Sequence, residues 1–160
     1  MRSNSIALAA AAAAALALAV GARADAGGQV PFSASFSGTI AFTSPSTTHH
    51  DGSGQATHMG LTTDSGSVIL SPPDDAGCYP NFNTETLTAA NGDQLVLQWH
   101  DRACPIGPTS FHSNGQWVVV GGTGRFADET GGGSFSGEAD FGPGLSPGTF
   151  RLTFTGTLQS

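Results

Sequence analysis

The sequence predicts an all-β domain that closes into an antiparallel β-barrel of about eight strands, with a two-sheet sandwich as the alternative. Three observations lead to this prediction. Apolar residues recur at every second position through most of the chain, and the 160 residues include 23 glycines and nine prolines. No segment after residue 26 combines a helical period with capping residues. A chain of this length is typical of one domain around one core.

The alternation is clearest at the two ends of the domain. Residues 31–43 place their apolar side chains at even positions, and the segment that closes the chain repeats the pattern. These positions are Phe32, Ala34, Phe36, Ile40 and Phe42, and then Phe150, Leu152, Phe154 and Leu158. Because an apolar edge strand invites aggregation, two such end strands favour a sheet that closes on itself.

Six further segments between the two ends alternate as strands do. They are residues 54–61, 65–70, 84–90, 94–100, 111–120 and 134–141. We expect a hairpin turn at residues 63–66, and a second one at Asn91-Gly92, because Asn and Gly tolerate the positive φ of tight turns. Together with the end strands these segments give about eight strands.

The first 24 residues have the pattern of a secretory signal peptide. Arg2 precedes an apolar run over residues 6–20, and small residues then mark cleavage sites after Ala24 or Ala26. The run is shorter than the roughly 20 residues of a spanning helix. We therefore expect a mature barrel domain at residues 25–160 that is secreted or periplasmic and has no membrane attachment.

Composition excludes several classes of function. Only 11% of residues are charged, and Lys is absent. Without residues 1–24 the chain keeps three Arg and all 12 acidic residues, a formal charge of −9. This balance excludes a basic nucleic-acid-binding protein and discourages contact with anionic lipid. We expect neither as a partner.

Cys78 and Cys104 predict one disulfide bond, because an even number of cysteines in an exported protein is typical of a bridge. Two free thiols are the alternative. The bridge would join the outer ends of the two strands on either side of Asn91-Gly92.

A glycine-rich segment follows the most apolar predicted strand. Gly122-x-Gly124-x-x-Ala127 has the spacing of a dinucleotide-binding fingerprint, but an alternating strand follows where that motif requires a helix. We therefore predict no cofactor. We predict a structural turn at Gly121, Gly122, Gly124 and Arg125, with Phe126 closing one end of the core.

Histidines are the candidate metal ligands. His49-His50-Asp51 has suitable side chains but lies in a polar segment that we predict to be an exposed hairpin loop, so no metal site is expected. His58 is predicted to lie in a strand on the face of Ala56 and to point into the barrel.

The order of several motifs resembles that of secreted bacterial proteins of the allene oxide cyclase barrel-like (dirigent-like) family. The motifs are residues 54–60, 90–93, 121–126, 131–134 and 150–158. The resemblance implies an eight-stranded antiparallel barrel with a cavity, often in homo-oligomers. It transfers no catalytic residues, because none maps onto this sequence.

The functional prediction is binding of a small apolar or amphipathic ligand inside the barrel. The candidate contact residues are Phe36, His58, Leu97, Trp99 and Phe154. One alternative is a cyclase or isomerase that acts through substrate shape, although no catalytic set is recognisable and binding is favoured. The other alternative is a non-catalytic structural or surface-interaction protein. An open, partly polar interior would favour binding or catalysis, and a filled interior would favour a structural role.

Overall fold

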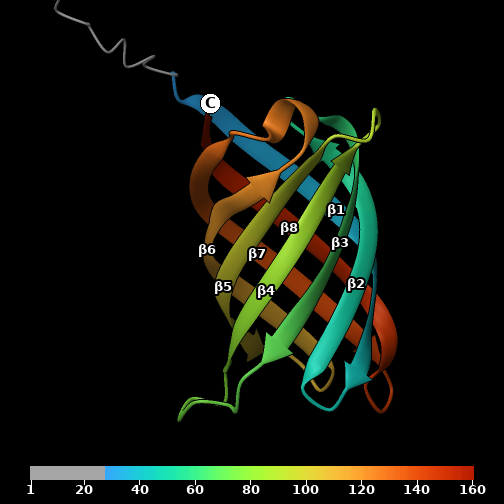
Figure 1. Cartoon of the computed structure of the whole chain (residues 1–160). Helices are drawn as coiled ribbons and strands as arrows, with labels where there is room; N and C mark the ends of the chain where they lie inside the picture. Colours follow the sequence, from blue (N-terminus) through green and yellow to red (C-terminus); the bar gives the residue numbers. More distant parts are fainter. Residues whose placement is uncertain (1–27) are drawn as a thin grey trace, which may run out of the picture.

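A computed structural model describes residues 28–160, so the predicted signal peptide lies outside the described residues. Eight antiparallel strands form one closed barrel (Figure 1). They are β1 (Val30–Ser44), β2 (Thr47–Ala56), β3 (Gly60–Leu70), β4 (Tyr79–Ala89), β5 (Gln94–Pro105), β6 (Ser110–Gly122), β7 (Thr130–Gly142) and β8 (Ser146–Gln159). The predicted fold class is confirmed, and the sandwich alternative is wrong.

The first and last strands close the barrel. Every strand pairs with its neighbours in sequence, and β1 also pairs with β8 from Val30–Leu158 to Ile40–Gly148. The predicted apolar positions Phe32, Ala34, Phe36 and Ile40 of β1 and Phe150, Leu152, Phe154 and Leu158 of β8 are buried, Phe42 is partly buried, and the odd positions between them are mostly exposed. The apolar period of two therefore places one face of each strand in a shared core.

One end of the barrel is filled and closed. The β6–β7 connection contains a single 3-10 turn, η1 (Gly124–Phe126), and the ring of Phe126 is buried there. Below it, Trp117 packs edge-on against Phe32 with ring centroids 5.3 Å apart. The indole Nε1 of Trp117 donates hydrogen bonds to the backbone oxygens of Ser134 and Thr155. Aromatic packing therefore occupies the half of the barrel next to η1.

The opposite end carries the predicted disulfide. Cys78 immediately precedes β4 and is bonded to Cys104 near the end of β5, which confirms the pairing. The neighbouring β3–β4 connection is further held by Arg102, whose Nε lies 2.6 Å from Asp74 Oδ2. The hydrogen bond from Arg102 lowers the pKa of Asp74 to about 2. Disulfide and ion pair together anchor the longest connection at this end.

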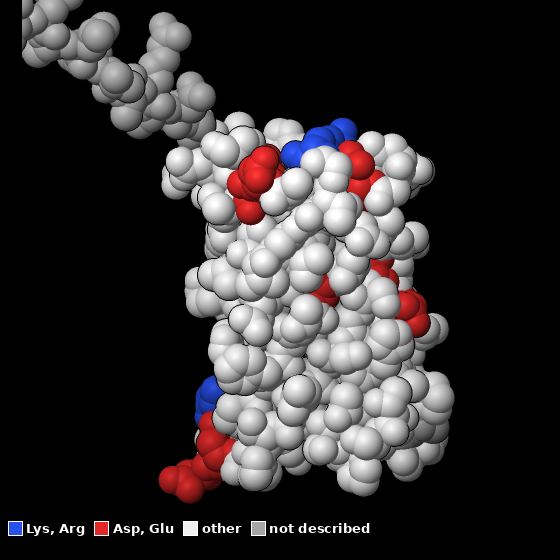
Figure 2. Space-filling view, viewed as in Figure 1, with Lys and Arg blue, Asp and Glu red and all other residues white. Residues whose placement is uncertain are grey.

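The surface is sparsely charged. On the face drawn in Figure 2, Lys and Arg side chains occur only towards the two ends of the barrel, each beside acidic side chains, and most of the side wall is uncharged. Within residues 28–160, no helix has the length and apolar character that a membrane span requires.

Two predictions about β2 and β3 are wrong. The turn between these strands lies at residues 57–59, not at residues 63–66, and the predicted exposed loop at His49-His50-Asp51 is part of β2. Most inward positions of these strands hold Thr, His, Gly or Asp, and only Ala56 and Val68 are buried apolar residues, so they show little apolar alternation. Backbone pairing with neighbouring strands makes them strands nevertheless.

The glycine-rich turn is shorter than predicted. Gly121 and Gly122 are the last residues of β6, and the turn proper begins at Thr123. Gly124 has a φ of 58°, in the left-handed region that disfavours side chains with a Cβ. Arg125 lies over the ring of Phe126, with its guanidinium carbon 4.8 Å from the ring centroid.

Gly124 and Gly121 provide a matched pair of substitutions. Gly124→Val should lower the free energy of unfolding by about 1–2 kcal/mol, because valine is strained at positive φ and its Cβ would collide with the carboxylate of Asp93. Gly121→Ala is the control, since a Cβ there meets no atom within 4 Å. Chemical denaturation measures both, and equal stabilities would contradict the structural role of Gly124.

Candidate functional site

The half of the barrel opposite η1 contains a cavity of about 460 Å³. It opens between the β1–β2, β3–β4 and β7–β8 connections, which contribute Pro45, Pro72 and Leu145 to its rim. Because strands of a closed barrel alternate in direction, these connections meet at the same end as the disulfide. The closed end lies on the far side of the packed aromatic core, so the cavity is a pocket with one mouth.

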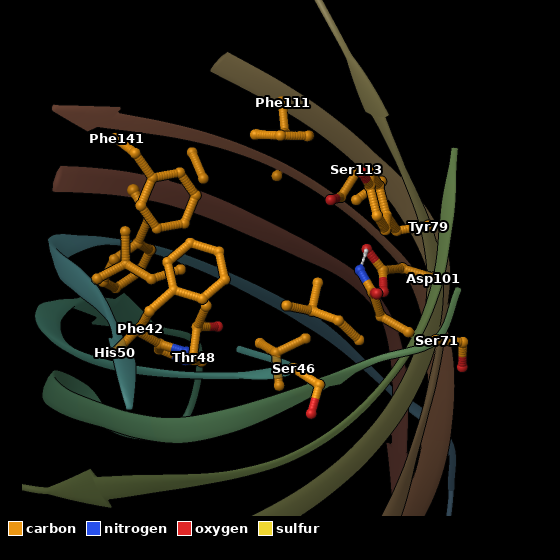
Figure 3. Close-up of a pocket in the computed structure, with 18 of the residues that line it drawn as sticks. Phe42, Ser46, Thr48, His50, Ser71, Tyr79, Asp101, Phe111, Ser113 and Phe141 are labelled. Carbon is orange, nitrogen blue, oxygen red and sulfur yellow. Dashed lines mark hydrogen bonds between the residues drawn. The ribbon is translucent and has the colours of Figure 1, made fainter. Parts of the chain in front are cut away.

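Aromatic rings form the outer wall of the cavity. Phe42 and Phe141 lie face to face at a tilt, with ring centroids 5.0 Å apart, and Phe111 packs edge-on against Phe141 at 6.1 Å. Tyr79, on the facing wall, contacts the end of this series, with its ring centroid 6.1 Å from that of Phe111. Figure 3 shows the rings of Phe42 and Phe141 on one wall, facing polar side chains across the space. The wall near the mouth is therefore apolar.

The facing wall is polar. Asp101, Ser113 and Tyr79 lie together on it (Figure 3), and Asn81 Nδ2 donates to Asp101 Oδ2 at 3.5 Å. Asp101 Oδ1 and Asn81 Oδ1 are buried and have no hydrogen-bond partner in the described part of the chain. Burial raises the pKa of Asp101 to about 6, although hydrogen bonds from Ser113 and Asn81 oppose this shift. Two residues that line the cavity thus carry buried acceptors without partners, and one of them has a carboxyl group that titrates close to neutral pH.

A second polar group lies at the inner end of the cavity. His50 and Trp99 line that end, and behind them lie Asp64 and Glu85, which are buried and do not line it. His50 Nε2 is 3.5 Å from Asp64 Oδ1 and 3.7 Å from Glu85 Oε2. Trp99 Nε1 donates to Glu85 Oε2 at 2.8 Å. We call His50, Asp64 and Glu85 the inner cluster.

The backbone register explains how three strands bring these side chains together. Gly66 of β3 pairs with His50 on β2 and with Glu85 on β4, so His50, Gly66 and Glu85 lie in one row across the sheet. Asp64 lies two residues before Gly66 on the same face of β3. A Cβ at Gly66 would lie 2.6 Å from His50 Cε1. Glycine therefore leaves the space in which the imidazole lies across β3 and reaches the carboxylates. The ring also packs edge-on against Phe150, with centroids 4.9 Å apart.

The inner cluster places one imidazole between two buried carboxyl groups, and each group shifts the protonation of the others. Burial, followed by the nearby charge of Glu85, raises the pKa of Asp64 to about 7, while His50 acts in the opposite direction. Burial acts to lower the pKa of His50, but the neighbouring carboxylates outweigh it and the net direction is upward. In the part of the chain that the structure describes, all three arginines are exposed, so His50 is the basic side chain available to these acids.

The sequence-predicted ligand contacts fall in three places. Trp99 lines the cavity, whereas Phe36, Leu97 and Phe154 are buried in the packed core outside its lining. His58 is not in a strand and does not point into the barrel: it is exposed in the β2–β3 turn, has a φ of 65°, and its Nε2 lies 3.1 Å from the carbonyl oxygen of Pro31. The prediction for His58 is wrong because β2 ends at Ala56 and the chain turns before the histidine.

None of four buried polar residues was predicted from the sequence to lie in the interior, and His50 was assigned to an exposed loop. Glu85 has the same parity as Leu87 and Ala89, and Asp101 has that of Leu97 and Trp99, so parity alone indicates that both face inward. His50 and Asp64 carry a weaker signal, because the inward neighbours of His50 are Thr48 and Gly52. Their strands alternate between polar and small residues, which resembles a loop.

No protein-family model matches this chain, and no curated protein matches it. The fold and the site define the class by themselves. The chain is a small, disulfide-bonded, eight-stranded antiparallel β-barrel with a buried aromatic core at one end and a cavity at the other.

The raised pKa of Asp101 predicts a pH-dependent stability. Its pKa is about 6 in the folded protein against 3.8 in the unfolded chain, so the folded state holds the proton more tightly. The contribution of Asp101 to stability is therefore most favourable below pH 4 and is lost as the pH rises through 6, by up to about 3 kcal/mol.

Asp101→Asn removes this dependence. The free energy of unfolding of the variant minus that of wild type should increase between pH 4 and 7 and then level off. Denaturation curves across this range measure the difference, with the exposed Asp128→Asn as the surface control. A difference that does not change with pH would contradict the assignment.

Proposed function

We propose that this protein binds a small, mostly apolar ligand with a polar end in the cavity, and that it acts by binding. The cavity carries the proposal. It has the size of a small-molecule site, its mouth is walled by aromatic and proline side chains, and a few polar groups converge on its deeper part. A barrel packed solid, which a purely structural role would favour, lacks such a space.

The polar wall indicates the chemistry of the ligand's polar end. Asp101 Oδ1 and Asn81 Oδ1 are acceptors without partners among residues 28–160. A buried polar group without a hydrogen bond costs about 1–3 kcal/mol. A ligand that carries an amine, hydroxyl or amide N–H would satisfy these acceptors while its apolar part contacts Phe42 and Phe141. We therefore favour a donor-bearing amphipathic ligand.

Other observations agree with an exported binding protein. A disulfide such as Cys78–Cys104 is typical of oxidising compartments. Export through the proposed signal peptide would deliver the chain to such a compartment. The likeness to the allene oxide cyclase barrel-like family supports a ligand in the barrel and, as a further proposal, a homo-oligomer. The acidic composition supports a neutral or cationic small molecule as the partner, and not nucleic acid or anionic membrane.

Fluorescent probe binding tests the proposed function. N-phenyl-1-naphthylamine is small and apolar and carries one N–H donor. Its fluorescence should increase saturably with the mature protein. Ala139→Trp, which fills part of the cavity, should weaken binding at least about tenfold, the effect of roughly 1.4 kcal/mol.

The matched control is Ala127→Trp, because Ala127 is exposed next to η1 at the closed end. It should bind the probe as wild type does. If the wild type fails to bind, or if both variants lose binding equally, the cavity is not the ligand site.

A cyclase or isomerase is the second candidate, and one observation favours it. Asp101 faces the cavity with a pKa of about 6, so its carboxyl group can donate or accept a proton near neutral pH. In that case Asp101→Asn would abolish conversion of a substrate while its binding in the cavity persists. If Asp101→Asn only weakens ligand binding, and the wild type converts no substrate, the protein acts by binding.

A further inference from the structure

We propose that the inner cluster of His50, Asp64 and Glu85 binds one divalent transition-metal ion, for which Zn²⁺ is the best match. The candidate ligand atoms all lie within 4.8 Å of one another. His50 Nε2 is 3.5 Å from Asp64 Oδ1 and 3.7 Å from Glu85 Oε2. An ion with bonds of about 2.0–2.2 Å separates tetrahedral ligands by roughly 3.3–3.6 Å. The two His50 distances are therefore close to the spacing around a central ion, and the carboxylate oxygens, within 4.8 Å of the other ligand atoms, would close around it.

The unpaired atoms are a second, independent observation. The side chains of His50, Asp64 and Glu85 are 2%, 0% and 0% exposed. Nevertheless His50 Nε2, both Asp64 oxygens and Glu85 Oε1 have no hydrogen-bond partner among the described residues. Buried polar groups in native proteins are almost always paired. Two of these unpaired atoms, His50 Nε2 and Asp64 Oδ1, lie 3.5 Å apart, and a metal ion between them would satisfy both.

Charge balance leads to the same conclusion. Two carboxylates buried in a barrel interior are unfavourable unless nearby positive charge compensates them. A divalent cation beside a neutral imidazole neutralises both carboxylates at once. The arginines, which are Arg102, Arg125 and Arg151 in the described chain, are all exposed and do not supply this charge.

The surroundings orient the ligands as partners around metal sites do. Trp99 Nε1 donates to Glu85 Oε2 and holds that carboxylate toward His50. The absence of a side chain at Gly66 lets the imidazole approach, since a Cβ there would lie 2.8 Å from His50 Nε2. Outer partners of this kind fix ligand orientation before the ion binds.

The ligand types select the ion. One imidazole nitrogen and two carboxylate oxygens suit Zn²⁺, whereas Ca²⁺ prefers six to eight oxygens and Mg²⁺ retains several waters. Three protein ligands also leave one tetrahedral position for water or another small ligand. The inner cluster is therefore a three-ligand site, not a closed structural one.

Metal titration of the chelator-treated mature protein tests the proposal. Isothermal titration with ZnCl₂ should show one ion per chain, and the thermal unfolding midpoint should rise with Zn²⁺ concentration. CaCl₂ should produce neither effect. Co²⁺, bound in place of Zn²⁺, should give the visible absorption of a tetrahedral nitrogen–oxygen site. Absence of both Zn²⁺ binding and Co²⁺ absorption would overturn the proposal.

Conservative variants locate the site. Asp64→Asn and Glu85→Gln retain size but lose charge, and each should weaken Zn²⁺ binding more than about 100-fold, since loss of an outer partner alone costs about 10–100-fold. Circular dichroism verifies that each variant is folded. If one of the two variants does not fold, the test relies on the other.

The control is His49→Ala. His49 lies on the outer face of β2, where its Nε2 is 3.1 Å from Asp51 Oδ2, so this pair offers the same ligand types at the surface. This variant should bind Zn²⁺ as wild type does. Binding that is lost in His49→Ala and kept in Asp64→Asn would assign the metal to the surface and refute the proposal. Probe binding in the cavity is measured separately, so either proposal can fail without the other.

Discussion

Pairing of β1 with β8 is the constraint on which the rest of this structure depends. These strands lie at opposite ends of the domain in sequence, yet eleven residue pairs join them. The pairing removes both sheet edges and turns a ribbon of strands into a closed wall. Once the wall is closed, every second residue faces inward whatever its chemistry. This is why the polar side chains of His50, Asp64 and Glu85 are buried together with the apolar residues of the barrel.

The interior then divides according to the size of its side chains. Near η1 the inward residues are large and apolar, and they fill the barrel from wall to wall. At the opposite end Asn81, Ala103 and Gly137 are small or polar, and the rings of Phe42 and Phe141 remain against the wall. The filled half supplies burial energy, and the hollow half supplies a site. The inner cluster lies at the boundary, where polar groups are shielded from water and remain close to the cavity.

The accuracy of the sequence predictions follows the strength of the apolar period. β1, β5 and β8 alternate clearly, and their location and inward faces were predictable. β2 and much of β3 alternate between polar residues and small residues, so residues 49–51 were assigned to a loop and the turn to residues 63–66. Glu85 and Asp101 could have been found from parity within their strands. His50 and Asp64 could not, because backbone pairing and not side-chain hydrophobicity decides that those segments are strands.

The sequence by itself determined that this protein is an all-β barrel with one disulfide, because periodicity, turn residues and paired cysteines are local signals. Only the tertiary structure decided what the interior can bind. The cavity depends on summed side-chain volumes across all eight strands. The inner cluster depends on the register that aligns His50 and Glu85 on either side of Gly66. Volumes and registers are properties of the closed sheet, since they arise from contacts between residues far apart in the chain.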